Sequence, residues 1–380
     1  MSPVYLDHNA TAPIRPEALA AMTAALNAGG NPSSVHGMGR AARARMEHAR
    51  AQVAALIGAP ASTIVFTSGG TEANALAIES AVAGGARRLL VSAIEHDAVL
   101  ETAKASGAEV VRLAVKPNGR LDLDTLATHL KAWDDAHGRP FVALMLANNE
   151  TGVIQPVAEA AVLVREAGGW LHVDAVQAAG RIAVDSRALG ADTLAISSHK
   201  IGGPPGAGAL TFGPRANLVR RLHGGGQERG RRAGTENVPG LVGFGAAAEA
   251  AQRDLELAGG QAGWRNAAEA ALAAAGAVPV GSDVERLPNT LCIAAPGFPA
   301  ELQVMTLDLA GVQVSAGSAC SSGKVKASHV LLAMGLDDLA GSAIRVSGGW
   351  SSRAEDWTYM VEAWITAYER HAARRRAPAA

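Results

Sequence analysis

The feature that most constrains the fold is the alternation of short β-type runs with longer alanine-rich segments through the first two-thirds of the chain. The β-type runs are mainly apolar and lack the strict alternation of half-exposed strands; they lie at 64–67, 88–92, 141–146, 170–173 and 193–196. Helix-like stretches lie between them at 40–57, 71–82, 123–133 and 157–167. Strands buried on both faces that alternate with helices are typical of a mostly parallel sheet. The pattern predicts an α/β domain that binds its ligand beyond the carboxyl ends of the strands.

The last third of the sequence predicts a second, smaller unit. Residues 238–275 have a long helical pattern dominated by alanine. They are followed by strand signals at 289–294, 312–314 and 343–347, and by helix signals at 300–309 and 353–370. We expect a large domain over 13–255 and a smaller α+β domain made of 1–12 and 256–380.

Charge and cysteine content exclude several classes of protein. The 34 Lys+Arg and 35 Asp+Glu leave a formal charge of −1, which is too little basic excess for a nucleic-acid-binding protein. Only Cys292 and Cys320 are present, which excludes a disulfide framework and a four-cysteine zinc site and favours a reducing compartment. The first residues show no signal-peptide pattern, and no window approaches the length of a membrane span. We expect a cytoplasmic protein that binds neither nucleic acid nor membrane.

Polar residues follow several of the predicted strands. Residues 68–74 read Ser-Gly-Gly-Thr-Glu-Ala-Asn before a helix, a turn that suits either phosphate binding or simple helix capping. Asp174 follows 170–173 and either caps a helix or pairs with the protonated nitrogen of a pyridine cofactor. His96 and Asn149 occupy similar positions, where a histidine can stack on an aromatic ring or move protons and an amide can donate to a ligand. A structural histidine and an ordinary polar turn are the alternative interpretations.

Lys200 is the strongest candidate for covalent chemistry. The sequence has only six lysines among 34 basic residues, and only lysine can form a Schiff base. Lys200 follows the run at 193–196, and the glycines after it leave room for a planar ligand. An ordinary surface lysine is the alternative interpretation.

The candidate nucleophile is Cys320, which lies among nine consecutive small residues at 315–323. Such a segment cannot anchor a core, so we expect it to be mobile, and the nearby Lys324 and Lys326 favour a thiolate. Cys292 lies in an apolar run and is expected to be structural. Arg345, within 343–347, suits either bidentate capture of a carboxylate or a structural salt bridge.

Taken together, these segments resemble the cysteine desulfurases of the NifS/IscS type, within the class V aminotransferase group of pyridoxal-phosphate enzymes. The resemblance covers essentially the whole chain, and its most specific segments are 31–34, 66–72, 147–152, 172–177, 199–200, 227–237 and 317–320. It implies a fold type I pyridoxal-phosphate-dependent transferase that works as a homodimer. In such an enzyme Lys200 would hold the cofactor as an imine.

The resemblance also implies a role for each candidate residue. Cys320, Lys200 and His96 would be catalytic, with His96 stacked on the cofactor ring and active in proton transfer. Arg345 and Asn149 would bind the substrate. Asp174 would face the pyridine nitrogen, and the remaining cofactor contacts would come from Gly70, Thr71, Asn149, Gln177, Ser197, Ser198 and His199, with Thr235 reaching across from the partner subunit.

An enzyme of this kind converts L-cysteine to L-alanine and leaves a persulfide on Cys320, which supplies a sulfur-acceptor or iron–sulfur scaffold protein. We expect no resident metal, although Cys320 could transiently ligate an iron–sulfur cluster. The alternatives are a selenocysteine lyase or another class V aminotransferase-type enzyme, and a partner protein that binds the cofactor without turnover. Two departures from the family pattern stand out: Ser198 replaces a usual glycine, and Lys326-Ala327-Ser328-His329 replaces Glu-Pro-Ser-His.

Overall fold

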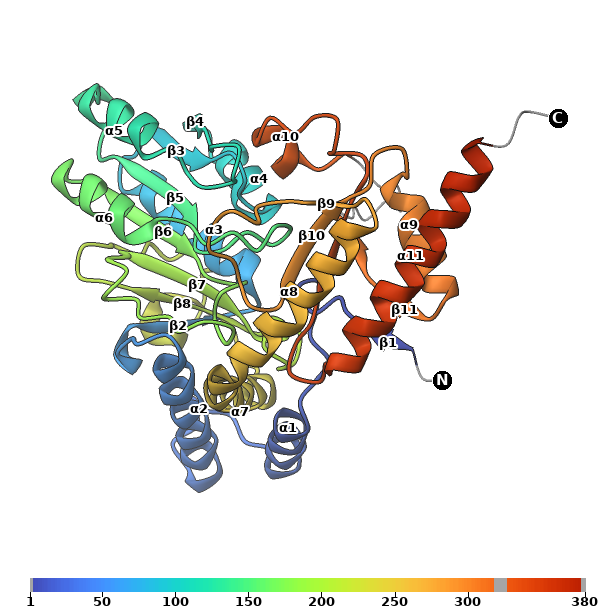
Figure 1. Cartoon of the computed structure of the whole chain (residues 1–380). Helices are drawn as coiled ribbons and strands as arrows, with labels where there is room; N and C mark the ends of the chain where they lie inside the picture. Colours follow the sequence, from blue (N-terminus) through green and yellow to red (C-terminus); the bar gives the residue numbers. More distant parts are fainter. Residues whose placement is uncertain (1–2, 318–326, 377–380) are drawn as a thin grey trace.

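The computed structural model describes residues 3–317 and 327–376. Its larger part is built on a seven-stranded sheet with the strand order β2-β8-β7-β6-β5-β3-β4 (Figure 1). Strand β8 (Gly208–Phe212) is antiparallel to both of its neighbours, and the other pairings are parallel. The remaining strands are β2 (Ile64–Thr67), β3 (Arg88–Ser92), β4 (Glu109–Leu113), β5 (Phe141–Met145), β6 (Trp170–Asp174) and β7 (Thr193–Ser197). The predicted mostly parallel sheet is confirmed.

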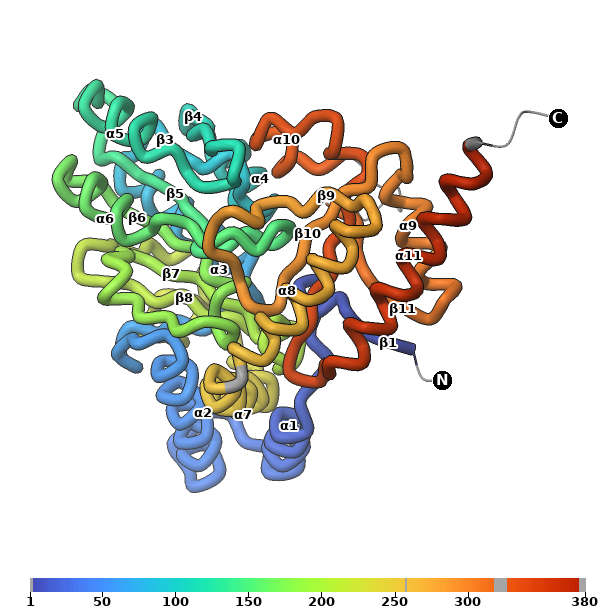
Figure 2. Tube along the Cα trace, in the orientation of Figure 1, coloured from blue at the N-terminus to red at the C-terminus, as the bar shows by residue number. Residues whose placement is uncertain are grey.

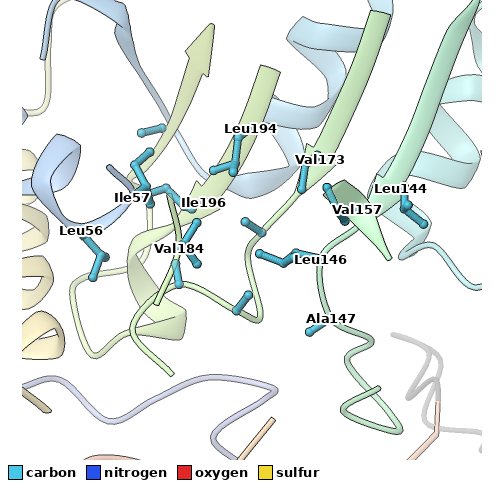
Figure 3. Close-up of a cluster of buried hydrophobic side chains, with 14 of the residues drawn as sticks. Leu56, Ile57, Leu144, Leu146, Ala147, Val157, Val173, Val184, Leu194 and Ile196 are labelled. Carbon is cyan, nitrogen blue, oxygen red and sulfur yellow. The ribbon is translucent and has the colours of Figure 1, made fainter. Parts of the chain in front are cut away.

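Helices cover both faces of this sheet. Successive side chains of a strand point to opposite faces, so buried strands need a layer of helices on each face. Leu144 and Val173 belong to a core on one face (Figure 3), and its helices are α2 (Gly37–Leu56), α5 (Leu123–Lys131), α6 (Val157–Glu166) and α7 (Val238–Asp254). Phe141 and Ala143 point to the other face, which is covered by α3 (Gly70–Ala83) and α4 (Asp97–Ala105). The sheet is therefore the middle of three layers, as the α/β prediction requires.

A four-stranded antiparallel sheet forms the smaller part of the molecule, on the right in Figure 1. Its strands, in spatial order, are β12 (Ser315–Ala316), β13 (Ala343–Ser347), β10 (Thr290–Ala294) and β9 (Val278–Pro279). The buried Trp357, Trp364 and Phe298 belong to the core of this part. The helices of this part are α8 (Ala258–Ala274), α9 (Ala300–Leu309), α10 (His329–Ala333) and α11 (Ala354–Arg376).

The start of the chain lies with its last third. Strand β1 (Val4–Tyr5) pairs in parallel with β11 (Val312–Gln313), next to α11 in the chain trace (Figure 2). Leu6 lies in the same core as Trp357. These contacts support our proposed division into 13–255 on one side and 1–12 with 256–380 on the other.

Several elements differ from the sequence-based expectation. The long helix expected at 238–275 is broken by a 3₁₀ turn at Leu255–Leu257 between α7 and α8. The strand expected at 312–314 is β11, which ends at Gln313, and β12 follows at Ser315–Ala316 in a different sheet. Helix α1 (Pro16–Ala28), β4 and β8 were not expected: α1 buries only two alanines, Ala18 and Ala25, and so carries little hydrophobic periodicity. Within the described ranges, no helix is long and apolar enough to cross a membrane.

Candidate active site

A cavity of about 190 Å³ opens at the carboxyl ends of β6 and β7, where the sequence predicts a ligand site. It is lined by Gly70, Thr71, Asn74, His96, Ala98, Met145, Asn149, Asp174, Val176, Gln177, Ser197, His199 and Lys200. A second cavity of about 230 Å³ shares His96, Asn149, Gln177 and Lys200 with the first. It extends to Asn9, Arg345 and His329, so the cleft lies between the two sheets.

The first turn of α3 forms an anion-binding end of the first cavity. Because its N-cap residue, Gly69, has no side chain, the first N–H groups of the helix are left for a ligand. A Cβ atom on Gly70 would lie 2.9 Å from Cγ2 of Val176 and 3.4 Å from Cβ of Ser197, so glycine permits the close approach of these segments. Thr71 and Ser197 line the same end. This arrangement fits a phosphate group.

Asp174 places a carboxylate in the wall of the cavity. Its Oδ2 accepts a hydrogen bond from Nδ2 of Asn74 at 2.7 Å, and its Oδ1 accepts one from the backbone nitrogen of Val176 at 2.9 Å. Asp174 is 6% exposed and forms no ion pair with any residue of 3–317 or 327–376. A buried carboxylate without a cation is costly. A cationic ring nitrogen in the cavity fits this position.

Asn74 is a site residue that sequence reasoning did not single out. Its Oδ1 lies 2.9 Å from Nε2 of His172, which is fully buried. Burial lowers the pKa of His172 to about 3, so the ring is neutral and Nε2 carries the proton that it donates to Asn74. The spacing of Asn74 could have identified it, because a residue four positions after Gly70 lies on the same face of α3, toward the strand ends.

Lys200 ends the 3₁₀ turn Ser198–Lys200 that follows β7. Its Nζ donates hydrogen bonds to the backbone oxygens of Asn9 at 2.6 Å and Ala10 at 2.8 Å. Burial and the charges of Arg345 and Arg181 lower the pKa of Lys200 to about 7, against the opposing influence of Asp174 and Asp7. An amine that is partly neutral near pH 7 can attack an aldehyde.

Two histidines line the cavity with this amine, and a buried glutamic acid lies near Asp174. Nδ1 of His96 accepts a hydrogen bond from the backbone nitrogen of Ala98 at 3.0 Å, so Nε2 carries the proton of the neutral ring. Burial and the charge of Lys200 lower the pKa of His199 to about 4. Burial and the charge of Asp174 raise the pKa of Glu95 well above its usual range.

Arg345 reaches the second cavity from β13. Its guanidinium group donates to Oδ1 of Asp7 at 2.7 Å and to the backbone oxygen of Asn149 at 3.2 Å. Nε of Arg345 and Oδ1 of Asn149 are buried and have no hydrogen-bond partner in the part of the chain that the structure describes. These two atoms, a donor and an acceptor, are therefore unsatisfied groups in residues that line the second cavity.

The other predicted site residues lie elsewhere. Ser198 lines neither cavity, because its buried side chain packs against Gly203. Thr235 is exposed and also lines neither cavity.

Cys320 and its two neighbouring lysines, Lys324 and Lys326, lie outside the described residues. Gly317, which precedes this gap, lines the second cavity. Ser328, which follows the gap, donates to Oε2 of Glu150 at 2.6 Å. Both ends of the segment that carries Cys320 therefore lie beside the second cavity.

The residues of the cleft fit pyridoxal phosphate. An anion-binding turn, a buried carboxylate and an amine of lowered pKa share one cavity, which matches the phosphate, the ring nitrogen and the aldehyde of this cofactor.

Comparison with known proteins identifies the family. The Aminotransferase class-V family matches residues 4–359. The cysteine desulfurase of Cereibacter sphaeroides is 43% identical over 372 residues, which are 93% of this chain and 93% of that protein. A NifS-like protein from Rickettsia africae has a solved structure with a TM-score of 0.88 and 32% identity, covering 97% of this chain and 99% of that one. The structure of SspA in complex with cysteine gives a TM-score of 0.76 and 29% identity, covering 90% of this chain and 98% of that one. The chain therefore belongs to the class V aminotransferase family and groups with its pyridoxal-phosphate-dependent cysteine desulfurases, as the sequence motifs predict.

Proposed function

We propose that this chain is a cysteine desulfurase that converts L-cysteine to L-alanine and carries the sulfur as a persulfide on Cys320. The observation that carries the proposal is the meeting, in one cavity, of the Lys200 amine with the Asp174 carboxylate and the first turn of α3. The likeness to cysteine desulfurases, and to a structure that contains cysteine, supports the same substrate.

The side chains of the first cavity would hold the cofactor. Gly70, Thr71 and Ser197 would bind its phosphate, and Asp174 would face its ring nitrogen. When bound, pyridoxal phosphate supplies an electron-withdrawing ring that makes the Cα proton of an attached amino acid easier to remove. Lys200 would hold the cofactor covalently, and its Nζ, once free, would move protons because its pKa lies near neutrality.

The second cavity would bind and orient the substrate. The guanidinium group of Arg345 would donate to the carboxylate of L-cysteine, and Asn149 would contact the same ligand. The thiolate of Cys320 would then attack the substrate sulfur: a sulfur–sulfur bond forms at Cys320 while the bond between the substrate's sulfur and Cβ breaks. The electron pair of the broken bond leaves with Cβ, which takes up a proton and becomes the methyl group of L-alanine. The position of Gly317 at this cavity supports delivery of Cys320 from that side.

We also propose a cytoplasmic homodimer that passes its sulfur to a sulfur-acceptor or iron–sulfur scaffold protein. Thr235 is exposed and lines neither cavity of the cleft in the part of the chain that the structure describes, which supports its use in the site of a partner subunit.

Two variants, Lys200→Ala and Cys320→Ser, test the proposed function. With dithiothreitol present, the wild-type protein should be yellow and form L-alanine and sulfide from L-cysteine. Lys200→Ala should lose both the borohydride-sensitive absorption and the activity, whereas Cys320→Ser should keep the absorption and lose activity by about 100-fold or more. Cys292→Ser is the matched control, because burial raises the pKa of the Cys292 thiol to about 12 and makes it a poor nucleophile.

An unchanged rate in Cys320→Ser would remove this cysteine from the reaction. A strong preference for selenocysteine over cysteine would favour a selenocysteine lyase, and dependence on a keto acid would favour an aminotransferase. A protein that binds the cofactor and turns over none of these substrates would be a binding partner only.

A further inference from the structure

Arg181 lies behind the cofactor cavity, and the proposed mechanism does not use it. One nitrogen of its guanidinium group donates to the backbone oxygen of Gln177 at 2.6 Å and to Oε1 of the same residue at 2.5 Å. The other donates to the backbone oxygen of His8 at 3.1 Å. Arg181 and Lys200 line a small cavity of about 40 Å³ on this side.

The contacts of Arg181 determine which way the Gln177 amide faces. A guanidinium group has no acceptor, so the Gln177 atom that meets Arg181 must be oxygen. The backbone oxygen of Asn9 has no proton to donate, so the Gln177 atom 3.0 Å from it must be nitrogen. Nε2 has two hydrogens and uses one on Asn9. Because Gln177 lines both cavities of the cleft, its second hydrogen is left for a ligand there.

The charge of Arg181 is not compensated within the described parts of the chain, where it forms no ion pair with any carboxylate. The other arginine that acts on Lys200 is Arg345, and Asp7 pairs with it at 2.7 Å. The carboxylates that act on the pKa of Lys200 are Asp174 and Asp7, and His96 and His199 line the first cavity with it. Asp97 and Glu150 line the second cavity with Lys200, and Asp254, which pairs with Arg15, lines the small cavity. Within residues 3–317 and 327–376, Arg181 is therefore the arginine that lowers the pKa of Lys200 without being paired to a carboxylate.

We propose that Arg181 is a positioning residue with two effects: it holds Gln177 as a hydrogen-bond donor toward the cofactor, and it places an uncompensated positive charge behind Lys200. The first effect favours an anionic oxygen on the cofactor ring, since a carboxamide turned the other way would present an acceptor. The second favours the neutral form of a nitrogen at Lys200 Nζ. The inference rests on the proposed role of Lys200 in holding the cofactor.

Two substitutions separate the two effects in the holoenzyme. Arg181→Gln removes the charge, and Arg181→Lys keeps the charge but loses the paired donors that hold Gln177. Arg187→Gln is the control, because Arg187 is exposed and its loss changes the net charge equally. The measurements are the pH midpoint of the visible absorption of the holoenzyme and the Kd for pyridoxal phosphate. Circular dichroism verifies that each variant is folded.

We expect Arg181→Gln to raise the pH midpoint by about one unit, and Arg181→Lys and Arg187→Gln to leave it within about 0.3 units. Arg181→Lys should weaken the binding of pyridoxal phosphate by about 10-fold. In a Gln177→Leu background the same substitution should have less than about a threefold effect, because its contribution passes through Gln177.

Equal pH midpoints in Arg181→Gln and wild type would overturn the electrostatic effect. The positioning effect would be overturned if Arg181→Lys weakened the binding of pyridoxal phosphate as much in the Gln177→Leu background as in the wild type. If Arg181→Gln does not fold, Arg181→Met in a Gln177→Leu background measures the midpoint instead. The two failures are distinguishable. A wild-type protein without borohydride-sensitive absorption would overturn the proposed function and the inference with it, whereas normal wild-type absorption with unchanged Arg181 variants would overturn the inference alone.

Discussion

Two walls enclose the candidate active site, and they are built in different ways. The sheet wall (Gly70, Thr71, Asp174 and Ser197) comes from strand ends and a helix start of the large sheet. The crossing wall (Asp7, Asn9, Ala10 and Arg345) joins the start of the chain to β13. Its central ion pair links residues 338 positions apart in the sequence.

The two walls differ in what each requires in order to form, and we expect one to act on the cofactor and the other on the substrate. The sheet wall is formed within one layer of parallel strands, so it exists wherever that sheet forms. The crossing wall requires the two sheets to pack together, with a bridge between Asp7 and Ser347 that brings the amino-terminal segment to β13. Changes to the sheet wall should therefore act on the cofactor, and changes to the crossing wall should act on the substrate and on Lys200.

The largest effect should come from the sheet wall. Asp174→Asn removes the only charge of this wall, and an amide cannot stabilise a cationic ring nitrogen in the same way. We expect kcat to fall by about 10²–10³-fold, with a shifted visible absorption and a KM that changes little. Steady-state kinetics and absorption spectra measure this. A loss of less than about tenfold would contradict the role given to Asp174.

A change to the crossing wall should instead raise the KM for L-cysteine. Arg345→Lys keeps the charge but loses the fork that serves Asp7, Asn149 and a substrate at once. We expect KM for L-cysteine to rise about 10–100-fold while the visible absorption of the holoenzyme stays unchanged. If the spectrum changes and KM does not, the two walls do not divide the chemistry as described.

The pH dependence of stability tests the environment of Lys200, where the walls meet. The pKa of Lys200 is about 7 in the folded chain, against an ordinary value of 10.5. Below pH 7 the amine is charged in both the folded and unfolded states, and its burial destabilises the fold. Between pH 7 and about 10 the unfolded chain binds the extra proton, so stability from this group rises with pH.

In the apoprotein, the variant Lys200→Met should lack this rise of stability between pH 7 and about 10. We expect it to be more stable than wild type at pH 6, by on the order of 1–3 kcal/mol, and to differ less at pH 9. Urea unfolding at the two pH values measures the difference. The same stability gap at both values would show that Lys200 has an ordinary proton affinity.

The smallest effect is expected where the segment that carries Cys320 is attached. Oγ of Ser328 donates to Glu150 and accepts from the backbone nitrogen of Leu331 at the start of α10. Ser328→Ala should lower the free energy of unfolding by about 1–2 kcal/mol and change kcat only a few-fold. Ser328→Thr, which keeps the hydroxyl group, is the control. A loss of kcat as large as that of Cys320→Ser would mean that this contact does more than attach the segment.

The sheet wall was more accessible to sequence reasoning than the crossing wall. Asp174 and Lys200 each follow a recognisable strand within a few residues, so the rule for parallel sheets places both at the same edge of the sheet. The buried Cys292 was also correctly expected to be structural. The carbonyl groups of Asn9 and Ala10 carry no such signal, because backbone oxygens are common to every residue and only their position makes them partners of Lys200.

By itself, the sequence determined the α/β architecture and the class V family, and it predicted the residue types of the candidate cofactor site, because strand periodicity and short motifs act over a few neighbouring residues. The tertiary structure alone decided how Asn74 orients Asp174, how Asp7 holds Arg345 and where the charge of Arg181 lies. These contacts join segments far apart in the chain, and their geometry depends on how the two sheets and the amino-terminal segment pack. Hydrogen bonding and charge act through distance in space, which a linear pattern does not record.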